Sequence, residues 1–159
     1  MDPFSRTGLL LGQEAMEKLK NARVAVFGIG GVGSFAAEAI ARGGVGHIAL
    51  IDGDVVSLTN INRQLIALHS TVGREKTAVM AERIRDICPE TEVAEYPVNY
   101  TAENRDLIDF ASYDYIVDAI DTVTGKLQLV QRATEAGTPI ISCMGTGNKL
   151  DASAFEVSD

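Results

Sequence analysis

Short apolar runs alternate with amphipathic stretches along most of this chain. The runs are rich in Val, Ile and Ala and are followed by turn residues, which is typical of buried parallel strands. We predict strands over 24–27, 47–51, 93–96, 115–119 and 140–144. Helical spacing of apolar residues predicts helices over 13–20, 33–41, 76 up to Pro89, 104–110 and 124–136. The alternation predicts an α/β fold: a doubly wound, mainly parallel sheet with helices on both faces, similar to a Rossmann fold.

The turn after the first predicted strand is crowded with glycine. It contains Gly28, Gly30, Gly31 and Gly33. Glycine lets the backbone approach a phosphate closely, and the helix that follows directs its unpaired N–H groups and positive dipole end at the same point. Asp52 ends the next strand about twenty residues on, where dinucleotide-binding proteins place a ribose partner. The pattern predicts a nucleotide site. The alternative is a glycine turn kept only for close packing of helix on strand.

The composition is that of an ordinary globular protein. The chain has 159 residues, of which 46% are hydrophobic and 23% charged, and this suggests one domain. No apolar run reaches the length that spans a bilayer, and we see no signal-peptide core, so we expect a cytoplasmic protein without a membrane partner. The net charge of −8 gives no bulk attraction to nucleic acid, although a local basic patch or a further segment could supply one.

The two ends of the chain carry separate expectations. Residues 1–8 are predicted as an arm that carries Arg6, because nearby proline and glycine limit regular structure. With the first helix they make an N-terminal arm over about residues 1–20. All of 1–159 is expected to form one nucleotide-binding domain. Because the sequence stops just after the fifth predicted strand, we expect it to be the N-terminal part of a longer fold.

The interval over 55–73 is the longest without a predicted strand. A loop of this length inside a compact α/β domain is usually functional. It carries Asn60, Arg63 and Gln64, and Lys76 opens the helix that follows. A lysine at the start of a helix is electrostatically unfavourable, which indicates an anionic ligand nearby.

The glycine turn with Asp52 is compatible with NAD, FAD or ATP. Arg63, as a bidentate fork, and Lys76, as a point charge, could bracket a triphosphate. Asp121, after a central strand, could hold Mg²⁺ through one or two oxygens while phosphates complete the metal's shell. These charges would together stabilise the attack of a carboxylate on the α-phosphate. The groups favour phosphate chemistry over hydride transfer, which needs a nicotinamide pocket with an acid or base beside it.

Other polar residues have simpler interpretations. Asp54 is a candidate for the binding site, with a solvated turn acid or a hydrogen-bond anchor for the loop as the alternatives. Asp118 is interpreted as structural, and Lys126 as part of a solvated helix face, with contact to the substrate as the alternative. Two cysteines make neither a disulfide scaffold nor a zinc site. Cys88 at a helix end and Cys143 inside the last predicted strand are interpreted as buried packing residues.

The motifs of this chain resemble those of a known superfamily. They are Arg6, Gly28-Ile-Gly-Gly-Val-Gly33, Asp52-Gly-Asp54-x5-Asn60-x2-Arg63-Gln64, Lys76 and Asp118-x2-Asp121. This set resembles the ubiquitin-activating-enzyme-like adenylyltransferases, to which ThiF, MoeB and HesA proteins belong. Further motifs are similar to the tRNA threonylcarbamoyladenosine dehydratase branch. They are Phe4-Ser-Arg-Thr7, Leu58-Thr-Asn-Ile-Asn-Arg-Gln64, Val117-Asp-Ala-Ile-Asp-Thr-Val-Thr-Gly-Lys126 and Met144-Gly-x-Gly-Asn-Lys-Leu-Asp151.

The resemblance implies ATP and Mg²⁺ as cofactors. In that branch, the carboxylate of the threonylcarbamoyl group on tRNA adenosine is adenylated and then cyclises with loss of AMP. By position, Asp52 would hold the ribose hydroxyls, Gln64 would line the site and Asp121 would bind the metal. The residues that would contact the phosphates are Asn60, Arg63 and Lys76.

The resemblance also implies partners. Family members are dimers, so Arg6 on the arm would reach the site of a neighbouring subunit. The tRNA substrate would be bound through parts beyond this chain, where a downstream cysteine of the family would also lie. Three alternatives stay open. They are adenylation of the C-terminal glycine of a ubiquitin-like sulfur-carrier protein, an NAD-dependent oxidoreductase, and a nucleotide-binding scaffold without activity.

Overall fold

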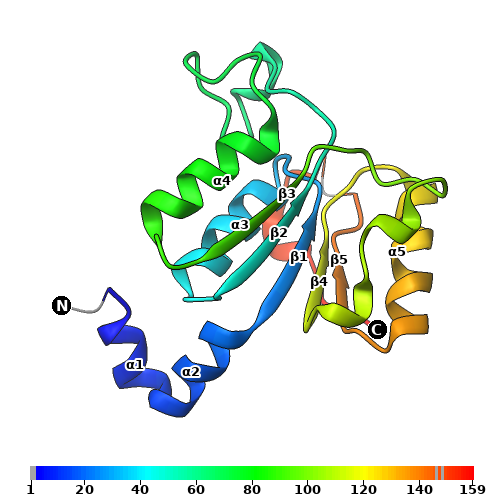
Figure 1. Cartoon of the computed structure of the whole chain (residues 1–159). Coiled ribbons are helices and arrows are strands. Elements are labelled where there is room, and N and C mark those ends of the chain that lie inside the picture. The colour runs from blue at the N-terminus through cyan, green and yellow to red at the C-terminus, as the bar shows by residue number, and fades with distance from the viewer. Residues whose placement is uncertain (1–2, 146, 148) are drawn as a thin grey trace.

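A five-stranded parallel sheet lies at the centre of the molecule (Figure 1). The computed structural model describes residues 3–145, 147 and 149–159, so residues 1 and 2 of the arm and positions 146 and 148 of the last motif lie outside the described residues. The strands lie in the order β3-β2-β1-β4-β5, and every neighbouring pair is parallel. Their bounds are β1 Arg23–Phe27, β2 His47–Ile51, β3 Glu92–Tyr96, β4 Tyr115–Asp118 and β5 Ile140–Ser142. The predicted fold class is confirmed.

Helices of the chain cover both faces of this sheet and extend beyond one of its ends. The helices in the described residues are α1 Ser5–Leu11, α2 Gln13–Asn21, α3 Gly33–Arg42, α4 Lys76–Ile87 and α5 Val123–Ala136, with short 3-10 turns η1 Leu58–Asn60, η2 Arg105–Leu107, η3 Phe110–Ser112 and η4 Ala152–Ala154. Helices α3 and α4 lie on one face, and α5 with the segment before β4 lies on the other (Figure 1). No helix in the described part of the chain combines the length and apolar character that a membrane crossing requires.

Alternate residues of the central strands face two separate apolar cores. Val24 and Val26 of β1 pack on the side of α3 and α4, whereas Ala25 and Phe27 pack on the side of α5. Successive side chains of a strand point to opposite faces, so a strand covered on both faces must be apolar throughout. For this reason, the central strands are visible in the sequence as continuous apolar runs rather than as alternating patterns.

The strand order reverses between β1 and β4. The chain runs from β1 outward to β2 and β3, and then returns to form β4 and β5 on the other side of β1. In open α/β sheets, ligands bind outside the carboxyl ends of the strands at such a reversal. The glycine turn follows β1 and Asp121 follows β4, so the topology brings both to this point.

Two predicted elements differ from the structure. The arm over 1–8 is wrong in part, because α1 forms over Ser5–Leu11 and passes through Gly8. A single glycine costs a helix about 1 kcal/mol, which good helix formers on both sides can offset, and the break falls instead at Gly12 with φ +85°. The helix predicted over 104–110 forms two separate 3-10 turns, since Asp109 caps the second turn through its side chain.

Candidate functional site

The glycine turn joins β1 to α3 and folds tightly on itself. Gly28 has φ +87°, and a Cβ there would lie 2.7 Å from the carbonyl oxygen of Ala119. A Cβ on Gly33 would overlap the carbonyl oxygen of Gly28. Gly30 and Gly31 differ, because a Cβ on either would come no closer than 3.5 Å to its nearest neighbour. Steric constraints therefore account for Gly28 and Gly33, whereas Gly30 and Gly31 leave half-buried backbone accessible beside the turn.

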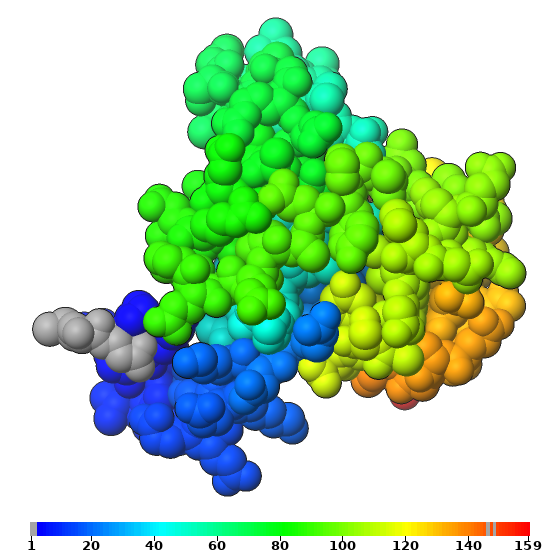
Figure 2. Space-filling model, in the orientation of Figure 1, coloured from blue at the N-terminus to red at the C-terminus, as the bar shows by residue number. Residues whose placement is uncertain are grey.

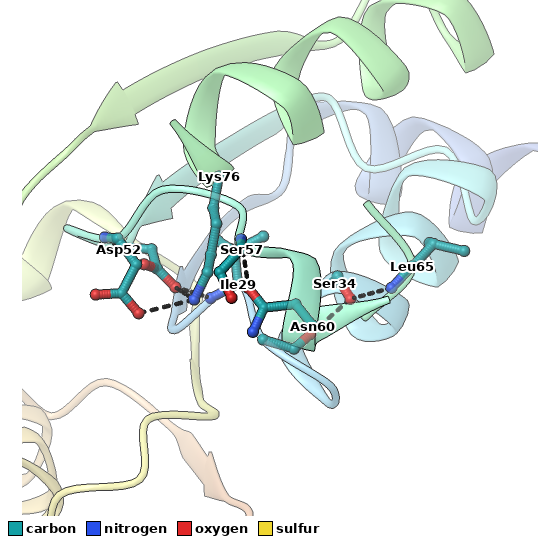
Figure 3. A network of polar contacts seen from close by, with 9 residues as sticks. Ile29, Ser34, Asp52, Ser57, Asn60, Leu65 and Lys76 are labelled. Carbon is teal, nitrogen blue, oxygen red and sulfur yellow. Dashed lines mark hydrogen bonds and ion pairs between the residues drawn. The ribbon is translucent and has the colours of Figure 1, made fainter. Parts of the chain in front are cut away.

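Asp52 ties the glycine turn to the end of β2 (Figure 3). Its Oδ2 accepts a hydrogen bond from the backbone N–H of Ile29 at 2.6 Å, and its Oδ1 accepts one from the N–H of Asp54 at 2.8 Å. The residue is only 9% exposed. Each carboxylate oxygen can accept more than one hydrogen bond, so both keep capacity for a ribose hydroxyl.

Lys76, the first residue of α4, is buried beside these two acids. Its Nζ donates to Asp54 Oδ2 at 2.8 Å and lies 3.9 Å from Asp52 Oδ2. These carboxylates neutralise the cation, which explains a lysine at the helix start without any ligand. The contact also supports the anchor interpretation of Asp54, although its side chain is 61% exposed. An ammonium has three donors, so Lys76 can hold Asp54 and still contact a phosphate.

Small polar side chains hold the loop over 55–73 in shape, and one of them, Ser34, also fastens it to the glycine turn (Figure 3). The hydroxyl of Ser34 donates to the carbonyl oxygen of Gly30 at 2.6 Å and accepts from the N–H of Leu65 at 3.2 Å. The Oδ1 of buried Asn60 accepts from the N–H of Ser57 at 2.9 Å. Sequence reasoning did not assign a role to Ser34, and its only signal was a small polar residue beside a turn.

Two further candidates lie against the glycine turn. Gln64 is buried, and its Nε2 lies 3.7 Å from where a Cβ on Gly30 would be. Its Oε1 is buried and has no hydrogen-bond partner within the described residues. Arg63 is exposed, and its Cγ lies 3.6 Å from where a Cβ on Gly31 would be. Its Nη1 donates to the carbonyl oxygen of Thr59 at 3.0 Å, which holds the guanidinium over the loop.

Asp121 lies in the loop between β4 and α5. The backbone of Ala119 and Ile120 contacts the turn at Gly28, which brings Asp121 to the same edge of the sheet. The side chain is exposed and makes no hydrogen bond within the part of the chain that the structure describes. The described residues also contain no group of three His, Cys, Asp or Glu side chains suited to holding a metal ion.

Lys126 contradicts its sequence interpretation. It is 7% exposed, and its Nζ lies 3.1 and 3.2 Å from the two carboxylate oxygens of Asp118. The solvated-face prediction is therefore wrong, whereas a structural Asp118 fits the contact. One face of α5 carries the apolar residues Val123, Leu127 and Val130, and this face is exposed. Lys126 lies instead on the buried face, together with Leu129.

Arg6 is not brought to the site of its own chain. It is exposed on α1, which packs near the start of β2, because Phe4 lies 3.5 Å from where a Cβ on Gly44 would be. This is the end of the sheet opposite to the glycine turn. Figure 2 shows the blue N-terminal segment projecting from the lower side of the body.

The fold and the site together define the class of protein: a Rossmann-like α/β protein whose glycine turn, acids and lysine converge at the switch point of the sheet. The chain belongs to the ThiF family, whose model matches residues 4–157. It is 49% identical over 156 residues to the tRNA threonylcarbamoyladenosine dehydratase of Bacillus subtilis, covering 98% of this chain and 61% of that relative.

Solved structures of a related enzyme share the fold. The Escherichia coli tRNA N6-threonylcarbamoyladenosine dehydratase, TcdA, has been solved in complex with ATP, and it matches with a TM-score of 0.95 and 42% identity over 99% of this chain and 65% of that chain. A complex of TcdA with AMP matches equally well. The chain thus spans about three fifths of the length of the curated relative and of the solved protein.

Proposed function

We propose that this chain is the ATP-binding part of an enzyme that adenylates a carboxylate. The substrate we infer is threonylcarbamoyladenosine in tRNA, whose activated carboxyl group is then attacked within the same molecule, closing a ring with release of AMP. The observation that carries the proposal is the convergence of buried Lys76, Arg63 and the glycine turn at one edge of the sheet. The ATP and AMP complexes of TcdA support it.

The proposed roles follow from the contacts. Lys76 would donate to a phosphate oxygen while Asp54 holds its ammonium in place. Arg63 would add a second cation, and Asn60 would shape the loop that presents it. Asp52 would accept from the ribose hydroxyls, and the unpartnered amide oxygen of Gln64 is suited to a donor on the nucleotide. Fixed positive groups of this kind stabilise charge that develops on the α-phosphate during attack.

We propose Asp121 as the protein's ligand for Mg²⁺. Nucleotide-bound Mg²⁺ keeps several waters and uses one or two carboxylates beside the phosphates, so it needs no preformed cage of protein ligands. An exposed carboxylate at the end of a central strand fits that requirement. When bound, the ion would neutralise part of the triphosphate charge.

The proposal includes a homodimer in which Arg6 serves the partner's site. Helix α1 carries Arg6 next to Leu9 and Leu10, which are 89% and 84% exposed. Such a run of exposed leucine is a natural contact for a second copy of the chain.

We propose that the protein works in the cytoplasm, because an enzyme acting on tRNA works where tRNA is found. Contact with tRNA, or with a sulfur-carrier protein in the alternative activity, would involve parts beyond this chain.

Exchange of labelled pyrophosphate into ATP tests the function. We expect exchange by the full-length protein only with tRNA that carries threonylcarbamoyladenosine, together with release of AMP. No exchange and no AMP with that tRNA would contradict the proposal. Exchange stimulated by a ubiquitin-like carrier protein would favour the sulfur-carrier alternative, and tight NADH binding without ATP binding would favour an oxidoreductase.

A further inference from the structure

A buried ion pair lies beside the proposed nucleotide site without belonging to it. Asp118, at the end of β4, is fully buried and accepts both contacts from the ammonium of Lys126. Lys126 also donates to the carbonyl oxygen of Cys143 at 2.7 Å. The hydroxyl of Ser142 donates to Asp118 Oδ2. The pair therefore links the ends of β4 and β5 to the first turns of α5.

The ion pair joins the two sides of the loop over 119–122, because Asp118 precedes this loop and Lys126 follows it in α5. The N–H of Ile120 donates to Asp118 Oδ1 at 3.2 Å, and the N–H of Ala119 donates to the carbonyl oxygen of Phe27 at 2.8 Å. One end of this loop is thus held by the ion pair, and its backbone also packs on the glycine turn. Asp121 is an exposed carboxylate of this loop, and the neighbouring Thr122 is exposed as well.

Burial of two charges is an inefficient way to attach a helix. Removing both ions from water costs free energy that their attraction returns only when the geometry is good, and apolar residues of similar volume often hold a helix equally well. The neighbouring buried positions of α5, Leu129 and Ala133, are apolar. The pair therefore calls for an explanation other than adhesion of α5 to the sheet, and fixing the geometry of the loop it closes is such an explanation.

We propose that the Asp118–Lys126 pair positions Asp121 for the metal. The pair acts through the loop over 119–122 and touches neither nucleotide nor substrate, so both are positioning residues. The inference rests on the proposed ATP site and on Asp121 as the Mg²⁺ ligand. Groups that orient a metal ligand typically contribute about 10- to 100-fold to metal affinity.

The test is the double variant Asp118→Asn with Lys126→Met, which removes both charges and leaves neither ion buried alone. Binding of ATP is measured with Mg²⁺ and in EDTA, together with the thermal midpoint. We expect affinity with Mg²⁺ to fall by about tenfold or more, whereas affinity in EDTA changes by less than about threefold. Lys126→Arg, which keeps the charge, should retain more of the Mg²⁺-dependent affinity than Lys126→Met alone.

The matched control removes another ion pair, with Glu38→Gln and Arg83→Met. This pair joins α3 to α4 away from the loop, and its loss should leave the Mg²⁺ dependence unchanged. Equal losses with Mg²⁺ and in EDTA, or no loss in a folded double variant, would overturn the inference alone. Absence of ATP binding by the unaltered chain would overturn the proposed function as well, so the two failures are distinguishable.

Discussion

At the scale of single residues, Lys76 shows how position and partner can be confused in a sequence. Its place at a helix start indicated an anionic ligand, yet the structure surrounds its ammonium with Asp52 and Asp54. The two carboxylates neutralise the lysine, so its position at the helix start can be explained without a ligand. Whether Lys76 also acts on the nucleotide is therefore tested by substituting it.

We expect Lys76→Met to abolish most adenylation. Removing one charged donor to a developing oxyanion typically costs about 100-fold or more in rate, and Asp52 and Asp54 would also lose their counter-ion. The readout is pyrophosphate exchange at saturating ATP. Lys20→Met is the matched control. The Lys20 side chain is exposed, and its Nζ forms a surface ion pair with Glu90 Oε2 at 3.8 Å. A Lys76→Met protein with unaltered exchange would refute the assignment.

The four glycines separate a packing role from a ligand role. We expect Gly33→Ala to prevent stable folding, since its Cβ would overlap a carbonyl oxygen. Gly31→Ala should change the free energy of unfolding by no more than about 1 kcal/mol, because its Cβ has room. If a phosphate approaches Gly31, this variant should nevertheless bind ATP more weakly. Full ATP affinity in Gly31→Ala would instead favour the packing interpretation. Denaturant unfolding and calorimetric titration measure the two effects.

At the scale of elements, the sequence predicts what apolar periodicity controls. The strand over 47–51 has its predicted bounds, because both faces of a central parallel strand must be apolar. The pattern fails in α5, where the apolar stripe with Leu127 is exposed and Lys126 is buried against Asp118. Burial of a charge depends on a partner eight residues away, which no local pattern reveals. The ties made by Ser34 were missed for the same reason.

The contact between α3 and α4 gives a pH-dependent prediction. The guanidinium of Arg83 holds the pKa of Glu38 below its ordinary value of 4.5. A lowered pKa means that the pair stabilises the fold above about pH 4.5 and that this stability is lost as the pH falls through the folded-state pKa. Glu38→Gln should therefore cost about 1 kcal/mol at pH 7 and nothing in strong acid. Urea unfolding at several pH values measures the difference, and a constant difference would contradict the assignment.

At the scale of the whole molecule, the topology was predictable but the position of the N-terminal helices was not. Strand and helix order indicated where the glycine turn and Asp121 would meet. Nothing local showed that α1 would lie at the other end of the sheet, with Leu9 and Leu10 exposed. The two exposed leucines offer an apolar contact, and this is the basis of the proposed dimer.

We expect the protein to sediment as a dimer and Leu9→Asp with Leu10→Asp to sediment as a monomer. A sharper test mixes Arg6→Ala subunits with Lys76→Met subunits. If Arg6 serves the partner's site, half of randomly mixed dimers contain one complete site of two, and about a quarter of the parent activity returns. If Arg6 served its own chain, or none, the mixture would not show this gain over its separate components.

The hydroxyl of Ser34 has a consequence that extends beyond its two hydrogen bonds. It bonds to the glycine turn on one side and to the loop over 55–73 on the other, so a movement of the turn would displace the loop as well. Binding of a ligand at the turn would therefore change the position or mobility of the whole loop. The amide of Leu65 should report this coupling as slower hydrogen exchange when ATP is added, and Ser34→Ala should uncouple the two.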